Sequence, residues 1–471
     1  MRLALSLAAV WLIGLLTLLC LGWGRTATTG RGRSVLTCLA IGIGLGVSSS
    51  LFVVWLLFGA PAAAFPYAES VLLVLLAVGA FVGRSRNRRP SQYLDRSSQV
   101  GRPVLSLVLS LSVACAVIAF VAEWMTNRQG AWDAWMTWNM HARALFRGGE
   151  QWREVLTGLP AWSHPDYPLL VPGSVARVWT YAGQETTFAP GAVAMLFTFA
   201  TIGLLYSAVA SLRSRTQGVL AALVLLGTKF YILQGASQYA DIPLSFFFLA
   251  TLALLSLGEL SESNRSRLVM MAGVAAGLSA WTKNEGTLFV LALVIAYGLV
   301  MGPALGWRTA LATLRSFAIG LGPAVLLLAF FKINLAPAND LLSDHGLRQS
   351  AERLFDGGRY VQILTGFTQA VLEVGAKGLL VVLLAAYLLA VGSTQVEPAS
   401  RDARVAVIVI GLMLAGYAAV LLTAPAPLLD TNIRSINRLL LQLWPSMLFA
   451  CFMGARTIEE AGIVTPRLSP A

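Results

Sequence analysis

The chain has 471 residues, of which 57% are hydrophobic and only 12% are charged. A soluble domain of this size needs more polar surface, so the composition predicts an all-α, polytopic membrane protein. The formal net charge of +12 does not indicate a nucleic-acid partner, because the cations gather in short loops between apolar runs, as the positive-inside rule predicts for cytoplasmic loops.

Apolar runs of about 20 residues, enough to cross a bilayer, predict about thirteen transmembrane helices. They cover residues 3–22, 35–58, 65–83, 103–122, 190–211, 217–234, 241–258, 268–282, 286–305, 316–333, 376–393, 405–423 and 438–455. These runs divide the chain into an amino-terminal block of about four spans and a core of about nine spans. The predicted parts are the block 1–123, an extracytoplasmic loop 124–189, the core 190–455 with a second external loop 335–375, and a cytoplasmic tail 456–471.

The charges of alternate loops predict the orientation. Basic loops contain the run 84–102 and the pairs Arg213 and Arg215, Arg265 and Arg267, Arg308 and Arg315, and Arg401 and Arg404. These loops should be cytoplasmic, so the acidic loops face outward. We therefore expect a multi-pass protein of the cytoplasmic membrane of a prokaryote, with its site on the extracytoplasmic face. The four cysteines all fall in apolar runs, which argues against a disulfide framework.

The first external loop begins with a segment, residues 131–146, whose periodicity fits an amphipathic helix ended by Gly148 and Gly149. One predicted face carries Trp132, Trp135, Trp138, Ala142, Leu145 and Phe146, and the other carries Asp133, Thr137 and His141. Such a helix is typical of the membrane interface, with the aromatic face in the headgroups and Asp133 toward water. Alternatively, Asp133 only stabilises the helix dipole.

The same loop continues with a proline-rich strap, SHPDYPLLVP, in which Pro165, Pro168 and Pro172 predict an extended turn. The turn would hold His164, Asp166 and Tyr167 in fixed positions. The alternative is a connector with a solvated Asp166.

More ionisable residues occur where other predicted spans reach the outer surface. They are Asp241 in YADIPL, Lys283, Asn284 and Glu285 in TKNEG, and Arg434 and Arg438 before and within RLLLQLWP. Ionisable groups beside a bilayer are costly unless they are paired or functional. Their gathering at one surface therefore favours a site, although helix capping and structural pairing are alternative roles for Asp241 and Glu285.

These motifs, in this order and on one side of the membrane, resemble the GT-C membrane glycosyltransferases. They are most similar to glycosyltransferase family 39, which includes protein O-mannosyltransferases and lipid A aminoarabinose transferases. The resemblance covers roughly residues 124–455 and implies a membrane glycosyltransferase. Its donor would be a sugar on a polyprenyl phosphate, and its acceptor an extracytoplasmic hydroxyl of a lipid, a glycan or a protein.

Carboxylate base catalysis fits such a transfer, with Asp133 as the first candidate and Asp166 as the second. Arg438, Arg434 and Lys283 are suited to stabilise the lipid phosphate as charge develops. Supporting roles are predicted for His164, Tyr167, Asp241, Asn284 and Glu285. Ala134 stands where many relatives carry Glu, and no clear metal-ligand motif is present. We therefore predict no certain cofactor and leave a divalent metal as an alternative.

Two other functions remain open from the sequence. A transporter or lipid flippase would also have many spans and a polar cavity, but it predicts essential ionisable residues near the middle of the membrane. An oligosaccharide polymerase or ligase would share the polyprenyl-linked substrate and an external loop.

Overall fold

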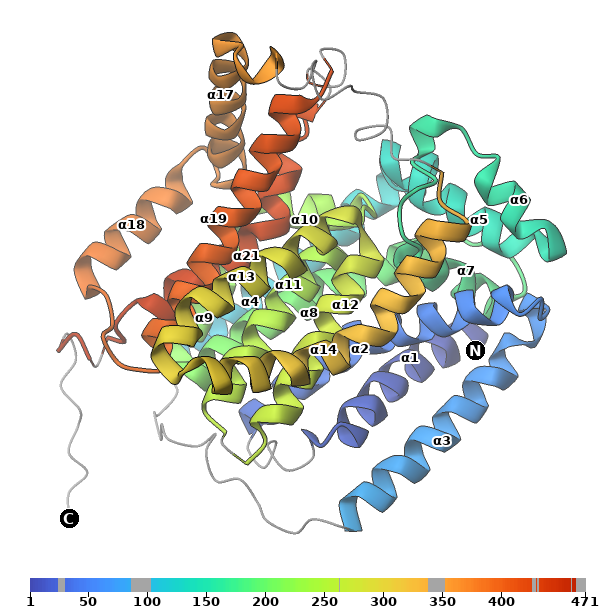
Figure 1. Cartoon of the computed structure of the whole chain (residues 1–471), viewed down its shortest axis with the longest axis horizontal. Coiled ribbons are helices and arrows are strands. Elements are labelled where there is room, and N and C mark those ends of the chain that lie inside the picture. Colours follow the sequence, from blue (N-terminus) through green and yellow to red (C-terminus); the bar gives the residue numbers. More distant parts are fainter. Residues whose placement is uncertain are drawn as a thin grey trace.

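The structure is a computed structural model, described here for residues 1–23, 30–85, 103–261, 263–337, 352–425, 429, 432–458 and 460–462. Most of the predicted basic loop 84–102, the middle of the second external loop and the end of the tail lie outside these residues. The covered parts fold almost entirely into helices, and their only β-contact is an isolated bridge between Ser393 and Ala455. The prediction of an all-α membrane protein is confirmed (Figure 1).

The helices that cross or line the bundle fall into two groups along the chain. Before the external segment they are α1 (Arg2–Cys20), α2 (Gly30–Leu57), α3 (Phe65–Ser85) and α4 (Pro103–Thr126). After it they are α8 (Phe188–Leu212), α9 (Arg215–Gly227), α10 (Lys229–Ala236), α11 (Asp241–Glu259), α12 (Arg265–Thr282), α13 (Asn284–Leu305), α14 (Trp307–Asn334), α17 (Gly357–Val374), α18 (Leu379–Val391), α19 (Ala399–Thr423) and α21 (Ile436–Gly454).

The number of spans differs in detail from the sequence prediction. Ten of the described helices are long and apolar enough to cross a membrane, and two bent pairs raise the count to twelve. The pair α9 and α10 bends by 64°, and the pair α17 and α18 bends by 82°. Residues 357–374, which were assigned to an external loop, therefore form a helix. The remaining predicted span, residues 268–282, corresponds to α12, which is not apolar enough to be among these candidates.

Helix α12 nevertheless runs antiparallel to α11 along its whole length. Lys283, just after α12, lies 3.1 Å from Asp241 at the start of α11. At the other end Arg265, which begins α12, lies 2.6 Å from Glu259, which ends α11. Because α11 and α12 are buried among other helices (Figure 1), α12 needs no lipid-facing surface, which explains its low hydropathy. We call the two ends of the bundle the Asp241 end and the Glu259 end.

Five short helices and a longer one form the external segment between α4 and α8. They are η4 (Ala134–Trp138), α5 (Asn139–Arg147), η5 (Gly149–Gln151), α6 (Trp152–Thr157), η6 (Ala161–Ser163) and α7 (Leu170–Ala182). The proline-rich strap was expected to exclude helix through Pro172, but α7 begins at Leu170. Pro172 is tolerated there because it lies in the first turn, where the backbone N–H has no helical acceptor.

A buried ion pair fixes α7 to the amino-terminal helices. Arg177 donates from Nε and Nη2 to the Glu69 carboxylate at 2.8 and 2.6 Å, and Nη2 also donates to the Ser6 carbonyl at 2.9 Å. Glu69 also accepts hydrogen bonds from Ser48 and Tyr181. Since Glu69 and Arg177 are almost completely buried, these contacts must replace the water that both charges lose on folding. They connect α1, α2, α3 and α7.

We expect Glu69→Gln to lower the free energy of unfolding by about 3–5 kcal/mol, because Arg177 would keep a buried charge without its carboxylate. The thermal unfolding midpoint of the purified protein in detergent measures this effect. Exposed Glu154→Gln is the matched control and should leave the midpoint unchanged. If Glu69→Gln unfolds at the wild-type temperature, the pair does not stabilise the fold.

Candidate active site at the Asp241 end of the bundle

Asp241 is the centre of a buried cluster of charged side chains. Its carboxylate accepts hydrogen bonds from Lys283 Nζ at 3.1 Å, from Arg438 Nε at 2.8 Å and from Gln442 Nε2 at 2.7 Å. These donors come from the junction between α12 and α13 and from α21, and Asp241 itself has no exposed surface. The cluster therefore joins the start of α11 to the α12–α13 junction and to α21.

The short α12–α13 junction places consecutive residues at different parts of the site. Lys283 has an extended backbone, with φ −160° and ψ 156°, so α12 ends there and α13 begins at once. Lys283 Nζ also lies 2.7 Å from Glu285 Oε1. Burial opposes the charged ammonium, but Asp241 and Glu285 outweigh it and raise the pKa of Lys283 above its ordinary range. Lys283 therefore stays charged.

Asp133 joins this cluster from the external segment. Its carboxylate lies 2.7 Å from Arg438 Nη1, and its backbone N–H donates to the Tyr239 hydroxyl at 3.2 Å. Arg438 therefore binds Asp133 and Asp241 at once, with its guanidinium 4.4 Å from the centre of the Tyr239 ring. The Asp133 side chain makes no capping hydrogen bond to the helix it precedes. Pairing with Arg438, and not capping, is thus its role in this structure.

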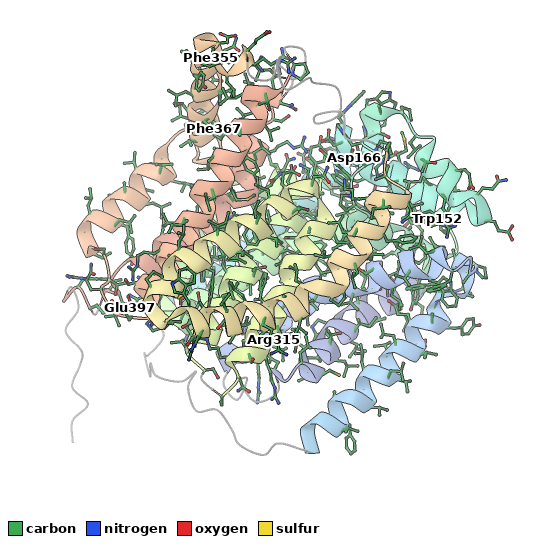
Figure 2. The ribbon with its side chains drawn as sticks, in the orientation of Figure 1. Trp152, Asp166, Arg315, Phe355, Phe367 and Glu397 are labelled. Atoms are coloured by element: carbon green, nitrogen blue, oxygen red, sulfur yellow. The ribbon has the colours of Figure 1, made fainter. Side chains whose placement is uncertain are left out.

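Asp166 forms a second cluster beside the first. Its carboxylate accepts a hydrogen bond from Asn284 Nδ2 at 2.9 Å and lies 3.6 Å from Lys332 Nζ, at the end of α14. Lys332 also donates to the Asp166 carbonyl at 2.6 Å and to Asn284 Oδ1 at 2.8 Å. Figure 2 shows Asp166 on one side of the molecule, away from Arg315 and Glu397. Asp166 is therefore not the solvated residue of a loose connector.

Stacked aromatic rings support the strap that carries Asp166. The His164 ring stacks on Tyr167 at 4.8 Å between centres, and Tyr167 stacks on Trp138 at 5.5 Å. Lys283 Nζ lies 5.8 Å from the centre of the Tyr167 ring, so the stacked rings also border the Asp241 cluster. His164 has φ +53°, a left-handed conformation that turns the strap sharply and costs a non-glycine residue some strain.

The predicted membrane-facing stripe of the external helix is wrong for three of its six residues. Trp132 and Trp135 are exposed, but Trp138, Ala142 and Leu145 are buried, and so are Thr137 and His141 on the opposite face. The reason is that residues 134–138 form a π-helix, whose turn holds more residues than an α-turn. A period of 100° per residue therefore misplaces the side chains, and α6 and α7 cover the helix that follows.

Nine of the ten predicted site residues thus lie in or against these two clusters. The exception is Arg434, which is exposed and is not joined to either cluster by any ion pair of the described residues. Sequence reasoning missed Gln442, Lys332 and Tyr239. Gln442 follows Arg438 by four residues and so lies on the same helix face. Lys332 could have been noticed as a cation at the end of an apolar run.

Among the residues described here, no group of three or more His, Cys, Asp or Glu side chains is placed to hold a metal ion. The polar atoms that converge are instead carboxylates paired with Lys, Arg, Asn and Gln. Chemically, this arrangement offers one partly exposed carboxylate, Asp133, next to a guanidinium that is anchored from behind by Asp241.

The fold and the site together define an integral membrane protein with two adjoining clusters of charged residues at the Asp241 end of its bundle. Residues 166–331 match the model of a family described as dolichyl-phosphate-mannose-protein mannosyltransferase. No curated protein and no solved structure matches the chain significantly. The matched region contains Asp166, Asp241, Lys283, Asn284 and Glu285, whereas Asp133 and Arg438 lie outside it.

The family match and the many apolar helices support a membrane glycosyltransferase of the GT-C type. They also support a donor in which the sugar is linked to a polyprenyl phosphate. The match to residues 166–331 agrees with the sequence-based resemblance at the level of this superfamily.

Burial lowers the pKa of His141 to about 4, so this side chain is neutral in the folded protein. An unfolded histidine titrates near 6.5 and binds a proton at higher pH than the folded one. The contribution of neutral His141 to the free energy of unfolding should therefore be fully present above about pH 6.5. It should fall by up to about 3 kcal/mol as the pH drops toward 4. Unfolding midpoints measured across this range test the prediction. His141→Phe should reduce the loss of stability at low pH, and the control His164→Gln should show the same loss as the wild type. If the unfolding midpoint changes equally with pH in all three proteins, the prediction is contradicted.

Proposed function

We propose that this chain transfers a sugar from a polyprenyl-phosphate donor to a hydroxyl group outside the cytoplasm, with Asp133 as the general base. The observation that carries the proposal is the position of Arg438, which binds buried Asp241 through Nε and partly exposed Asp133 through Nη1. One guanidinium therefore touches both the fixed part of the site and the residue proposed for the chemistry.

The balance of charge supports a role for Arg438 in donor binding. Lys283, Lys332 and Arg438 face the carboxylates of Asp133, Asp166, Asp241 and Glu285, so every cation is already paired. A donor phosphate needs a cation that can change partners. Arg438 can keep Asp241 and exchange Asp133 for a phosphate oxygen, because guanidinium groups bind carboxylate and phosphate with similar geometry.

This exchange would prepare Asp133 for catalysis. Once released from Arg438, its carboxylate can accept the proton of the acceptor hydroxyl as the hydroxyl oxygen attacks the anomeric carbon of the sugar. The bond between that carbon and the phosphate oxygen breaks, and the electron pair leaves with the polyprenyl phosphate. Arg438 then stabilises the negative charge that develops on the departing phosphate.

Asp166 is better suited to position than to catalyse. It is buried, and its carboxylate is held by Asn284 with Lys332 close by, so an acceptor hydroxyl has little access to it. The Asp133 side chain, by contrast, is 32% exposed. We therefore assign the proton transfer to Asp133, and to Asp166 the alignment of the strap with α13 and α14.

The site is proposed to face the outside of a prokaryotic cytoplasmic membrane. The support is the set of cations at or near the opposite ends of the helices, including Arg213, Arg265, Arg315 and Arg401, which the positive-inside rule assigns to the cytoplasm. The transporter alternative is less favoured because the acidic residues of the central helix α11 are at its two ends, Asp241 and Glu259, and not in its middle. The sugar and the acceptor are left open.

We expect Asp133→Asn to lower kcat for sugar transfer by about 10²–10⁴-fold, the usual contribution of a general base. Donor KM should not rise, because the neutral side chain competes less with phosphate for Arg438. Transfer from a panel of polyprenyl-phosphate sugars, in reconstituted membranes with total membrane acceptors, measures both constants. Exposed Glu150→Gln, in the same external segment, is the control with unchanged turnover. Wild-type kcat in Asp133→Asn would refute the assignment.

For Arg438→Ala, we expect a higher donor KM, because the phosphate loses its principal cation, and a lower kcat, because the leaving group loses stabilisation. Arg438→Lys keeps the charge but cannot bind two partners through a planar fork, so its donor KM should lie between those of the wild type and Arg438→Ala. Donor saturation curves for the three proteins make this comparison. Normal saturation in Arg438→Ala would exclude a role in donor binding.

A further inference from the structure

Gln442 and Lys283 hold one oxygen of the buried Asp241 carboxylate, and Arg438 holds the other. Gln442 Nε2 and Lys283 Nζ donate to Oδ1 at 2.7 and 3.1 Å, whereas Arg438 Nε donates to Oδ2 at 2.8 Å. The torsion that rotates an aspartate carboxylate is soft when nothing holds it. Because the two oxygens of Asp241 have different partners, rotation would break contacts on both, so Oδ2 stays directed at Arg438.

The amide of Gln442 is itself oriented by its neighbours. Its Oε1 accepts a hydrogen bond from the Tyr417 hydroxyl at 2.9 Å, and both side chains are buried. Its Nε2 lies 2.7 Å from Asp241 Oδ1 and 3.5 Å from Glu285 Oε1. A reversed amide would place its oxygen against two carboxylates, which accept hydrogen bonds but do not donate them when ionised. Tyr417 supplies the donor that Oε1 needs in the observed orientation, since a buried acceptor without a partner is costly.

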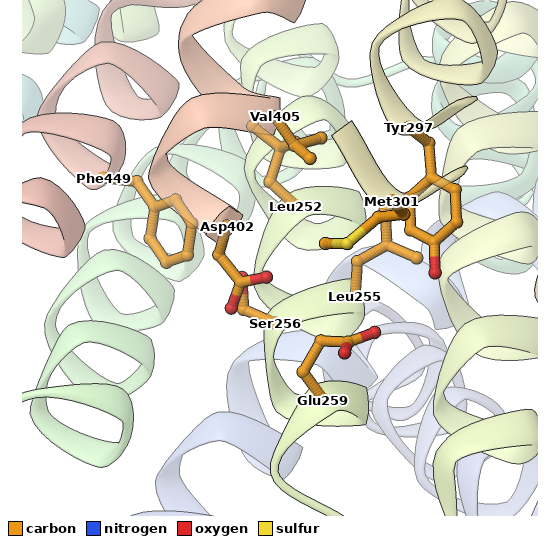
Figure 3. Close-up of a pocket in the computed structure, with 9 residues that line it drawn as sticks. All are labelled: Leu252, Leu255, Ser256, Glu259, Tyr297, Met301, Asp402, Val405 and Phe449. Carbon is orange, nitrogen blue, oxygen red and sulfur yellow. The ribbon is translucent and has the colours of Figure 1, made fainter. Parts of the chain in front are cut away.

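Helix α19 brings Tyr417 to this position along its buried face. At the Glu259 end, Asp402 and Val405 of α19 line a small cavity together with residues of α11, α13 and α21 (Figure 3). Val409, Met413 and Tyr417 continue the buried face at intervals of four residues, which keeps them on one side of the helix. Tyr417 therefore points into the bundle near the Asp241 end, where its hydroxyl meets α21.

We propose that Gln442, oriented by Tyr417, is a positioning residue for the donor phosphate. It fixes the rotation of Asp241, and Asp241 in turn fixes the guanidinium of Arg438, whose Nη1 reaches Asp133. This role depends on the proposed function, in which a phosphate oxygen replaces Asp133 on Arg438. Gln442 acts through Asp241 and not by contact with the phosphate. Its effect is on the direction of Arg438, and a misplacement of about 1 Å in such a site can lower the rate about 10²-fold.

The test compares donor saturation curves of the full chain in reconstituted membranes, with the panel of polyprenyl-phosphate sugars and total membrane acceptors. Gln442→Met keeps the length of the side chain but loses the hydrogen bonds to Asp241 and Tyr417. We therefore expect kcat/KM for the donor to fall about 10²-fold, with a higher donor KM. Tyr417→Phe loses one hydrogen bond, and we expect a fall of about tenfold. The matched control is Tyr231→Phe, which removes a buried 3.0 Å hydrogen bond to Ser245 and should keep the wild-type constants.

A second background separates positioning from a merely structural role. In Arg438→Lys the ammonium binds as a point charge and needs no directed carboxylate oxygen, so Gln442→Met should lower kcat/KM by a much smaller factor than in the wild type. Equal factors in both backgrounds, or wild-type donor constants in Gln442→Met, would overturn the positioning role alone. If Gln442→Met does not fold, as judged by its unfolding midpoint, Tyr417→Phe takes its place in both backgrounds. A wild type that transfers no sugar from any donor would overturn the proposed function and this role with it.

Discussion

The buried carboxylate of Asp241 is the interaction on which the candidate active site depends. An isolated charge without water around it is unfavourable by several kcal/mol, so Asp241 requires the donors that surround it. These donors are Lys283 of the α12–α13 junction and Arg438 and Gln442 of α21. The site is therefore complete only when α11, α21 and the α12–α13 junction are packed together. Its geometry is a property of the assembled bundle and not of any single loop.

The external segment contributes the two carboxylates of the candidate site that do not come from the helix bundle. Asp133 approaches Arg438 from outside the bundle, whereas Asp166 is held between α13 and α14 by Asn284 and Lys332. The two acids that looked equivalent in the sequence therefore have different surroundings. A partly exposed carboxylate can meet an incoming hydroxyl, and a buried carboxylate with its partners in place can align the chain. The same difference in environment gives neighbouring carboxylates separate roles in many enzymes.

Most of the membrane-spanning helices could be predicted because hydropathy indicates which segments lie in a membrane. The apolar runs located the helices, and the rarity of charges inside them marked Asp241, Lys283 and Arg438 as unusual. Helix α12 shows where hydropathy becomes a weak guide. A helix inside the bundle packs against other helices and not against lipid, so it does not need a strongly apolar sequence. Helix α7 was missed because Pro172 looked like a barrier to helix and was in fact within its first turn.

The contacts themselves could not be predicted from spacing. Nothing in the sequence indicates that Asp133 pairs with Arg438, because the two residues are far apart in the chain and only tertiary packing brings them together. The ion pair between Glu69 and Arg177 was missed for the same reason. Glu69 lies at the start of an apolar run, and Arg177 lies in a segment that was expected to be a loop. The burial of either charged residue can be explained only once the other is known to lie beside it.

The π-helix at Ala134–Trp138 has a consequence for how such sites are recognised. A π-turn accommodates one more residue than an α-turn while the helix on either side keeps its direction. A chain that is one residue shorter between Asp133 and His141 can thus present both side chains in the same way with an ordinary α-helix. The number of residues between Asp133 and His141 can consequently differ by one without a change in how they are presented. A search that requires fixed spacing in this segment would reject proteins that place Asp133 and the buried His141 in the same way.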